Sequence, residues 1–183
     1  MTATPADPLL LCIDMQPVFL AAIPESQRVH WRCSFALEVA AGLGVPVVFT
    51  EQVPDKLGRT AKDLLSLSAQ PIAISKDTFS ALADDKVAAH LASSGKKQLL
   101  ICGIETPVCV YQSARDAVQA GYQVTVLSDC VGARRGGDAT TVLTHLTHAG
   151  CNVLPAEAVF YSLLHDAKHA FFRDYTALVK KYS

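Results

Sequence analysis

Short apolar runs recur along the chain, and longer stretches with helical patterning separate them. Each run is four to six residues long, is rich in Val, Ile and Leu, and carries no charge in its interior. Such continuous runs are typical of strands buried on both faces of a parallel sheet. We therefore expect six strands, over residues 9–13, 45–50, 71–75, 97–102, 123–127 and 151–154.

The segments between these runs have apolar residues at three- and four-residue spacing, which is typical of amphipathic helices. Glycines that can end a helix follow several of them, at Gly44, Gly95, Gly121 and Gly150. We expect a loop or short helix over 15–23, and helices over residues 26–42, 61–67, 84–94, 107–120, 140–149, 157–165 and 169–182.

The alternation of strands and helices predicts the fold class. It indicates an α/β protein with a three-layer, doubly wound, Rossmann-like fold, in which helices cover both faces of a six-stranded parallel sheet. No internal repeat or linker interrupts the 183 residues, so we expect a single domain over 1–183. The polar segments 51–60 and 131–138 are expected to be loops.

One strand–turn–helix unit, residues 97–130, contains a well-placed thiol. Thr106 is a candidate N-cap, Pro107 suits the first helical position, and Cys109 falls in the first turn. The carboxyl end of a parallel strand is where open α/β sheets place their ligands. A helix amino terminus also favours negative charge, so we expect a stabilised thiolate at Cys109.

Composition excludes several classes of protein. Half of the residues are hydrophobic, 18% are charged and the formal net charge is −1, which favours neither disorder nor nucleic-acid binding. No apolar run is long enough to span a membrane, and the first residues, MTATPADP, leave no room for a leader peptide. No C-x-x-C motif occurs among the six cysteines, most of which fall in or beside predicted strands. We expect a cytoplasmic protein.

Three polar residues stand just past three different apolar runs: Asp14, Lys76 and Cys109. A parallel sheet brings such positions to one edge. A carboxylate can take the thiol proton, an ammonium can hold the carboxylate, and the sulfur can then attack an electrophilic carbon. The alternative is structural, because a strand-end Asp is a common turn residue, a strand-end Lys is often solvated, and a Cys at a helix start is often simply packed.

Several motifs together resemble those of a known family. LLLCIDMQPVF is followed by SKDTFSAL and then by LLICGIETPVCVYQSARDAVQAGYQVTVLSDCVGAR. This order, and above all G-I-x-T-x-x-C-V, resembles the isochorismatase-like cysteine hydrolase superfamily over about residues 8–165. The TEQVPDKLGRT segment further resembles its metal-free branch, the isochorismatase-domain-containing proteins.

The resemblance implies a role for each candidate residue. Asp14 would be the base, Lys76 the orienting cation and Cys109 the nucleophile, in a hydrolase acting on C–N bonds other than peptide bonds, or on esters, through a thioester. It also implies a cis peptide at Ile104–Glu105, which would turn the backbone N–H of Glu105, with that of Cys109, into an oxyanion hole.

Other implications concern metal and substrate. Family members that hydrolyse nicotinamide carry His-rich metal ligands after the second strand, whereas Glu51-Gln52-Val53 stands here, so we expect no metal and no other cofactor. The substrate would be a small molecule. By their positions in the chain, Phe19, Gln52, Phe79 and Thr106 are candidates for the wall of its pocket, although aromatic residues at such positions suit the core equally well. Relatives are often dimers or larger, so we expect a homo-oligomer without nucleic-acid or membrane partners.

Alternatives remain open at this point. His145 with His148, and His165 with His169, have metal-chelating spacing but no third ligand nearby, which favours surface or packing roles. Arg134-Arg135 can clamp an anionic substrate or belong to a solvated loop. The rival functions are a non-catalytic interaction protein, an isochorismatase-type vinyl-ether hydrolase and a nucleotide-dependent oxidoreductase, although no G-x-G-x-x-G follows a strand.

Overall fold

The computed structural model describes residues 7–183, and the expectation about a leader peptide rests largely on residues outside that range. The strands form one sheet in the order β3-β2-β1-β4-β5-β6, and every neighbouring pair is parallel. The six-stranded parallel sheet predicted from the apolar runs is confirmed. Its strands are β1 (Pro8–Ile13), β2 (Val47–Gln52), β3 (Ile72–Lys76), β4 (Gln98–Ile104), β5 (Gln123–Gly132) and β6 (Asn152–Leu154).

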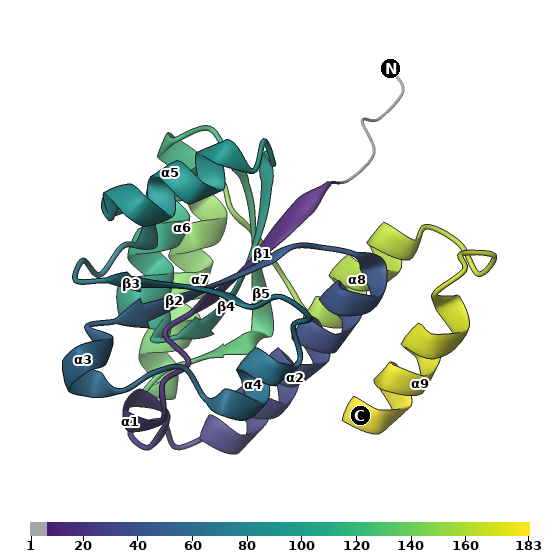
Figure 1. The fold of residues 1–183 in the computed structure, drawn as a ribbon, viewed down its shortest axis with the longest axis horizontal. Helices are drawn as coiled ribbons and strands as arrows, with labels where there is room; N and C mark the ends of the chain where they lie inside the picture. The colour runs from purple at the N-terminus through teal and green to yellow at the C-terminus, as the bar shows by residue number, and fades with distance from the viewer. Residues whose placement is uncertain (1–6) are drawn as a thin grey trace.

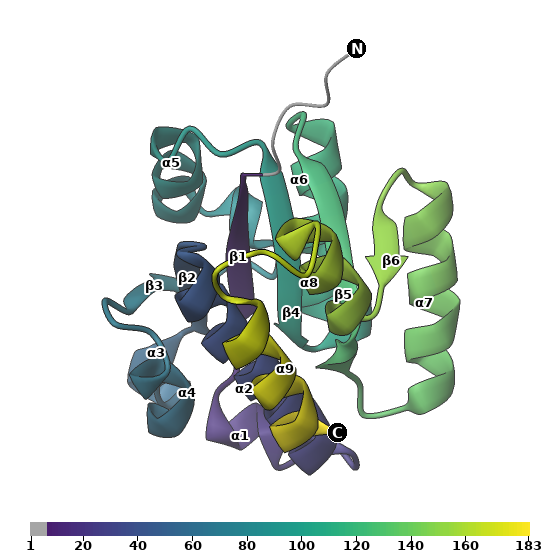
Figure 2. The same ribbon diagram turned by 90° about the vertical axis from the view of Figure 1, so that its right-hand side faces the viewer.

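Helices cover both faces of this sheet, so the doubly wound α/β fold class is also confirmed (Figure 1, Figure 2). One face carries α2 (Ser26–Leu43), α4 (Lys62–Ser66), α8 (Ala156–Leu164) and α9 (Phe172–Tyr182). The other carries η1 (Ala81–Ala83), α5 (Asp85–Ser93), α6 (Tyr111–Gln119) and α7 (Gly136–His148). The remaining turns are α1 (Pro17–Leu20), α3 (Pro54–Leu57) and the π-helical turn η2 (Thr106–Val110).

Strand β1 shows why a continuous apolar run is needed at the centre of the sheet. Leu10 and Cys12 pack into the core under α2, while Leu9, Leu11 and Ile13 pack into the core under α5 and α6. All of them are at most 1% exposed. Because successive side chains of a strand point to opposite faces, both sets must be apolar when helices cover both faces.

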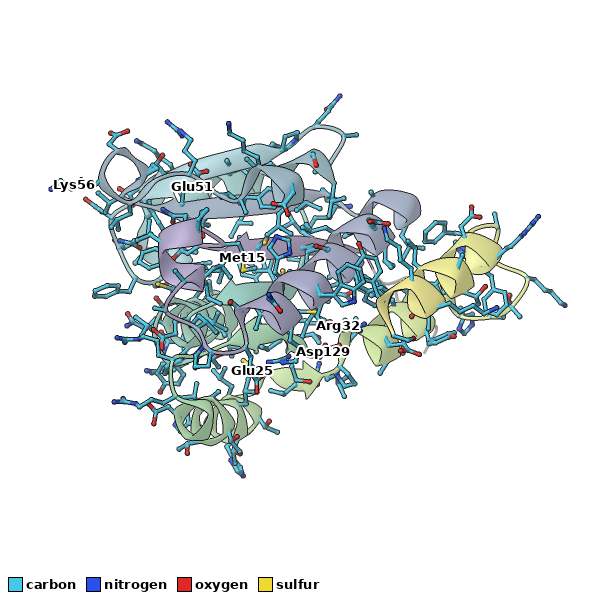
Figure 3. All side chains as sticks on the ribbon, turned by 90° about the horizontal axis from the view of Figure 1, so that it is seen from below. Met15, Glu25, Arg32, Glu51, Lys56 and Asp129 are labelled. Atoms are coloured by element: carbon cyan, nitrogen blue, oxygen red, sulfur yellow. The ribbon has the colours of Figure 1, made fainter. Side chains whose placement is uncertain are left out.

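A half-buried polar contact joins α2 to strand β5, on which it packs. Arg32 on α2 and Asp129 on β5 lie side by side, with Nη2 and Oδ2 2.8 Å apart (Figure 3). The other carboxylate oxygen of Asp129 accepts the backbone N–H of Ala156, the first residue of α8, at 2.8 Å. One side chain therefore fixes the start of α8 against both β5 and α2.

Several predicted boundaries were wrong, and pairing between strands explains why two of the strands are longer than expected. Strand β2 extends to Gln52 because Glu51 and Gln52 pair with Ser75 and Lys76 of β3. Strand β5 runs past the predicted end to Gly132, and α7 begins at residue 136 rather than 140. The expected loops at 51–60 and 131–138 are therefore both shorter than their composition indicated.

The strand order places a topological switch point between β1 and β4. Chain connections leave β1 toward β2 on one side, whereas β4 leads toward β5 on the other. Loops at the carboxyl ends of these two strands consequently diverge and leave a crevice, which is the usual ligand position in open α/β sheets. Within residues 7–183, no helix is long and apolar enough to cross a membrane.

Candidate active site

A cavity of about 310 Å³ opens at the switch point between β1 and β4. Asp14 follows β1 directly and Cys109 lies in η2, just after β4. Lys76 ends β3, two strands from β1, and its long side chain bridges that distance. Most of the cavity wall is apolar, and its lining residues include Asp14, Phe19, Ile23, Gln52, Phe79, Ile104, Glu105, Val108, Cys109 and Arg134.

The Asp14 carboxylate is buried and hydrogen-bonded on both oxygens. Oδ1 accepts the hydroxyl of Thr50 at 2.7 Å, and Oδ2 accepts Nζ of Lys76 at 2.7 Å. Asp14 has a φ of 51°, in the left-handed region that Asp and Asn tolerate better than most residues. This conformation ends the strand at Asp14, whose own N–H donates to the Thr50 carbonyl at 3.1 Å.

The Lys76 ammonium is also removed from solvent and is fully partnered. Besides Asp14, its Nζ donates to Oε1 of Gln52 at 2.6 Å and to the Thr78 carbonyl at 3.0 Å. The Lys76 side chain is 0% exposed and that of Asp14 is 2% exposed. A buried charge is tolerated only when it is paired and hydrogen-bonded, and here both conditions hold.

Cys109 is buried at the base of the cavity and holds its proton tightly. Burial raises the pKa of its thiol from the ordinary 9.0 to about 12, and the charge of Asp14 and a hydrogen bond to Asp14 add to the rise. Lys76 and a hydrogen bond from the backbone of Glu105 lower this pKa, but not enough to offset the rise. Burial and the charge of Asp14 therefore outweigh the stabilisation of a thiolate that the helix start was expected to give.

The backbone at the end of β4 brings Glu105 to the sulfur. The Ile104–Glu105 peptide is cis, as the resemblance implies. Gly103 has a φ of +111°, and a Cβ there would lie 2.1 Å from the Ile13 carbonyl oxygen, so only glycine fits between β4 and β1. The chain can then turn sharply and aim the N–H of Glu105 at Cys109.

Three of the four residues predicted to form a pocket line the cavity, namely Phe19, Gln52 and Phe79. Thr106 does not belong to the lining. It is fully buried, and its hydroxyl donates to the Gly132 carbonyl at 2.9 Å, which ties η2 to the end of β5. It is also not the N-cap, because Glu105 occupies that position.

Sequence reasoning missed two buried polar residues that hold the loop beside the site. Gln16 accepts the N–H of Gln52 at 2.7 Å and donates to the Gln52 carbonyl at 3.1 Å and to that of Gly58. Glu51, which is 1% exposed, accepts the Thr60 N–H at 2.9 Å. For Glu51 the available signal was a polar residue directly after an apolar run, without a breaker between them.

The Glu105 side chain has a partner of its own. Its carboxylate accepts the backbone N–H and the Nε–H of Arg134, each at 3.0 Å, and Arg134 lines the cavity. Arg135 is instead paired with Asp138 at 2.6 Å and does not line this cavity. The two neighbouring arginines therefore have different surroundings.

The histidine pairs with metal-chelating spacing have other contacts. His145 packs edge-on against Tyr111, and Nδ1 of His148 lies 3.0 Å from the Thr144 carbonyl oxygen. The backbone N–H of Phe171 donates to His169 at 3.1 Å. In the part of the chain that the structure describes, no three His, Cys, Asp or Glu residues are grouped so as to hold a metal ion.

Comparisons with known proteins agree with this architecture. A family model described as "Isochorismatase domain" matches residues 8–158. Isochorismatase family protein 1A of Dictyostelium discoideum is 33% identical over 179 residues, which cover 96% of this chain and 87% of that protein.

Solved structures give the same result. The structure of MAR1 ribonuclease from Caenorhabditis elegans superposes with a TM-score of 0.90 at 25% identity, covering 98% of this chain and 93% of that chain. The YcaC gene product of Escherichia coli, described as an octameric hydrolase of unknown specificity, has a TM-score of 0.83 at 21% identity. It covers 96% of this chain and 93% of that chain, and it supports the fold alone.

Proposed function

The chain belongs to the isochorismatase family, and from this premise we propose that it is a cysteine-dependent hydrolase of a small amide or ester. The observation that carries the proposal is a buried Asp14–Lys76 ion pair beside a mostly apolar cavity that Asp14 and the Cys109 thiol both line. A packed structural cysteine needs no buried ion pair beside it.

The raised pKa of Cys109 determines how the first step has to run. A thiol with a pKa of about 12 is not ionised at neutral pH, so a base must take its proton as the sulfur attacks. The Asp14 carboxylate lines the same cavity as that thiol and raises its pKa, and it is the group in position to take the proton. General-base assistance of this kind contributes roughly 10²–10⁴-fold to the rate.

The proposed reaction proceeds through an acyl-enzyme. A bond forms between Sγ of Cys109 and the substrate carbonyl carbon, the thiol proton passes to Asp14, and the carbonyl electron pair moves to oxygen. The backbone N–H groups of Glu105 and Cys109 stabilise that oxyanion. Collapse expels the amine or alcohol, which takes the proton from Asp14. Water then attacks the thioester, Asp14 accepts and returns its proton, and the acid leaves with the thiol restored.

Lys76 acts in this scheme by holding the base. Its ammonium donates to Oδ2 of Asp14, while Oδ1 accepts the Thr50 hydroxyl. The side-chain carbonyl of Gln52 and two backbone carbonyls also accept from the ammonium and fix its position. It also offsets part of the negative charge that opposes a thiolate at Cys109. A binding protein without catalysis would gain nothing from burying this set of charges.

Two other activities are less well supported by the site. Cleavage of a vinyl ether, as in isochorismate, does not require a sulfur nucleophile. Ribonuclease, the activity printed for the Caenorhabditis elegans neighbour, requires a site for an anionic phosphodiester. Here the cavity wall is mainly apolar, and the two cations at it, Lys76 and Arg134, are each already paired with a carboxylate.

The proposal includes surroundings and assembly. All six cysteines are free and buried, which suits a reducing cytoplasm. The octameric state printed for the Escherichia coli neighbour supports a homo-oligomer. The expected partner is a small-molecule substrate, and the near-zero net charge gives no electrostatic attraction to nucleic acid.

A library of small amides and esters tests the proposed function. Wild type and Cys151→Ala, which removes a buried cysteine outside the site, are expected to hydrolyse the same compounds. Cys109→Ala is expected to lose turnover by at least the general-base factor of roughly 10²-fold while remaining folded. Retention of full turnover by Cys109→Ala on such a compound would overturn the proposal.

A further inference from the structure

Glu105 faces the cavity with two groups of opposite electrostatic effect. Its backbone N–H donates toward the Cys109 sulfur, where negative charge develops during acyl transfer. Its side chain carries a full negative charge on the same residue and also borders the cavity. Left alone, that carboxylate would oppose the oxyanion that the N–H stabilises.

Arg134 removes this conflict. Its backbone N–H and its Nε–H each reach a different oxygen of the Glu105 carboxylate at 3.0 Å, so the contact is two-pronged. The Glu105 side chain is 18% exposed and that of Arg134 is 62% exposed, which places the pair between the interior of the cavity and solvent. Because the backbone takes part, the carboxylate also holds segment 133–135 beside η2.

The charges around the cavity then sum to zero in matched pairs. Asp14 is paired with Lys76 in the interior, and Glu105 is paired with Arg134 at the mouth. The adjoining wall consists of Phe19, Ile23, Phe79, Val108 and similar apolar groups. A charged compound entering this cavity would lose hydration without gaining an unpaired counter-charge.

We propose that the Glu105–Arg134 pair is a charge filter at the mouth of the cavity, which makes the site selective for small, uncharged acyl compounds with an apolar chain. This inference rests on the proposed hydrolase function. The pair acts by cancelling two fields: a free Arg134 would favour carboxylate-bearing compounds, and a free Glu105 would favour cationic ones.

Three matched esters without an internal nucleophile test the filter: 4-nitrophenyl pentanoate, 4-nitrophenyl 4-sulfobutyrate and 4-nitrophenyl 4-(trimethylammonio)butyrate, which are neutral, anionic and cationic. Glu105→Gln keeps the backbone N–H but leaves Arg134 uncompensated. It is expected to raise kcat/KM for the anionic ester relative to the neutral one by about threefold at low ionic strength. Arg134→Gln is expected to shift the preference toward the cationic ester by a similar factor.

The matched control is Arg135→Gln, which removes an arginine from the same loop that is paired with Asp138 and does not line the cavity. It is expected to leave the charge preference unchanged. The shifts in the two pair variants should shrink at about 1 M salt, where the Debye length is about 3 Å. Unchanged preferences in both pair variants, or an equal shift in Arg135→Gln, would overturn the filter.

A second measurement separates this inference from the proposed function. Iodoacetamide and iodoacetate alkylate the same sulfur but differ in charge, and the ratio of their rates on Cys109 does not depend on how much thiolate is present. Peptide mapping at a fixed alkaline pH gives this ratio even if no ester is hydrolysed. The rate with neutral iodoacetamide divided by the rate with anionic iodoacetate should fall in Glu105→Gln and rise in Arg134→Gln. Hydrolysis without these changes contradicts the filter alone, whereas these changes without hydrolysis contradict the proposed function alone.

Discussion

Replacing Lys76 with Met is predicted to destabilise the fold far more than the loss of one surface ion pair would. Both partners of the Asp14–Lys76 pair are at most 2% exposed on their side chains, and their charged atoms lie 2.7 Å apart. Lys76→Met leaves the Asp14 carboxylate buried without its cation. Removing one member of a buried pair typically costs about 3–5 kcal/mol, against a total stability of about 5–15 kcal/mol for a domain.

A second substitution shows whether the unpaired charge is the cause. Asp14→Asn removes the charge, keeps an oxygen that can accept the Thr50 hydroxyl, and suits the positive φ at this position. In the double variant the remaining groups are neutral, so it should be more stable than Lys76→Met alone, by roughly 2 kcal/mol or more.

Urea denaturation of the wild type, both single variants and the double variant measures all four free energies of unfolding. The reasoning predicts that the destabilisation in the double variant is smaller than the sum of the two single effects and smaller than that of Lys76→Met. A loss of less than about 1 kcal/mol in Lys76→Met, the size typical of an exposed pair, would refute it. Additive single effects would refute it as well.

Four further predictions concern other parts of the site. Gly103→Ala would put a Cβ 2.1 Å from the Ile13 carbonyl oxygen at a φ of +111°, so it should lower the thermal midpoint sharply, and an unchanged midpoint would contradict the close approach. Gln16→Leu leaves one N–H and two carbonyls of the backbone without their partner, and should cost about 1–3 kcal/mol and speed amide hydrogen exchange in segment 52–60; unaltered exchange there would contradict this. Because Asp14 raises the pKa of Cys109, Asp14→Asn should lower that pKa and speed Cys109 alkylation at a fixed alkaline pH while turnover is lost; slower alkylation would contradict it. The same raised pKa means that the thiol contributes fully to stability below pH 9.0, and that this contribution is lost as pH rises from 9.0 toward about 12, which alkaline denaturation of wild type and Cys109→Ala can compare.

The sheet could be predicted from sequence because its signal is local. Each central strand needs apolar residues on both faces, and that need produces runs such as Leu9–Leu10–Leu11 that are visible without any tertiary information. The convergence of Asp14, Lys76 and Cys109 followed from parallel strand topology, which brings strand ends to one edge. The sheet and the meeting of these three residues could therefore be predicted from periodicity and position alone.

Features that depend on distant partners could not be predicted in this way. Glu51 and Gln52 have the polar character of a loop, yet pairing with β3 draws them into β2. A helix start can be recognised locally, and it favours a thiolate at Cys109. The burial of the thiol and the nearby charge of Asp14, which raise its pKa, are set by the whole fold. The role of Arg134 required knowing that its loop reaches Glu105, 29 residues earlier.

The most direct test of the central claim is to trap the acyl group on the sulfur. Wild-type protein is mixed with a hydrolysed ester or amide, quenched in acid during turnover, and analysed by intact-mass and peptide-mapping mass spectrometry. We predict a mass increase equal to the acyl group, located on Cys109 and absent in Cys109→Ala, with Asp14→Asn strongly slowed in forming it. Full hydrolysis with no acyl group on Cys109, or an acyl group found only on another residue, would contradict it.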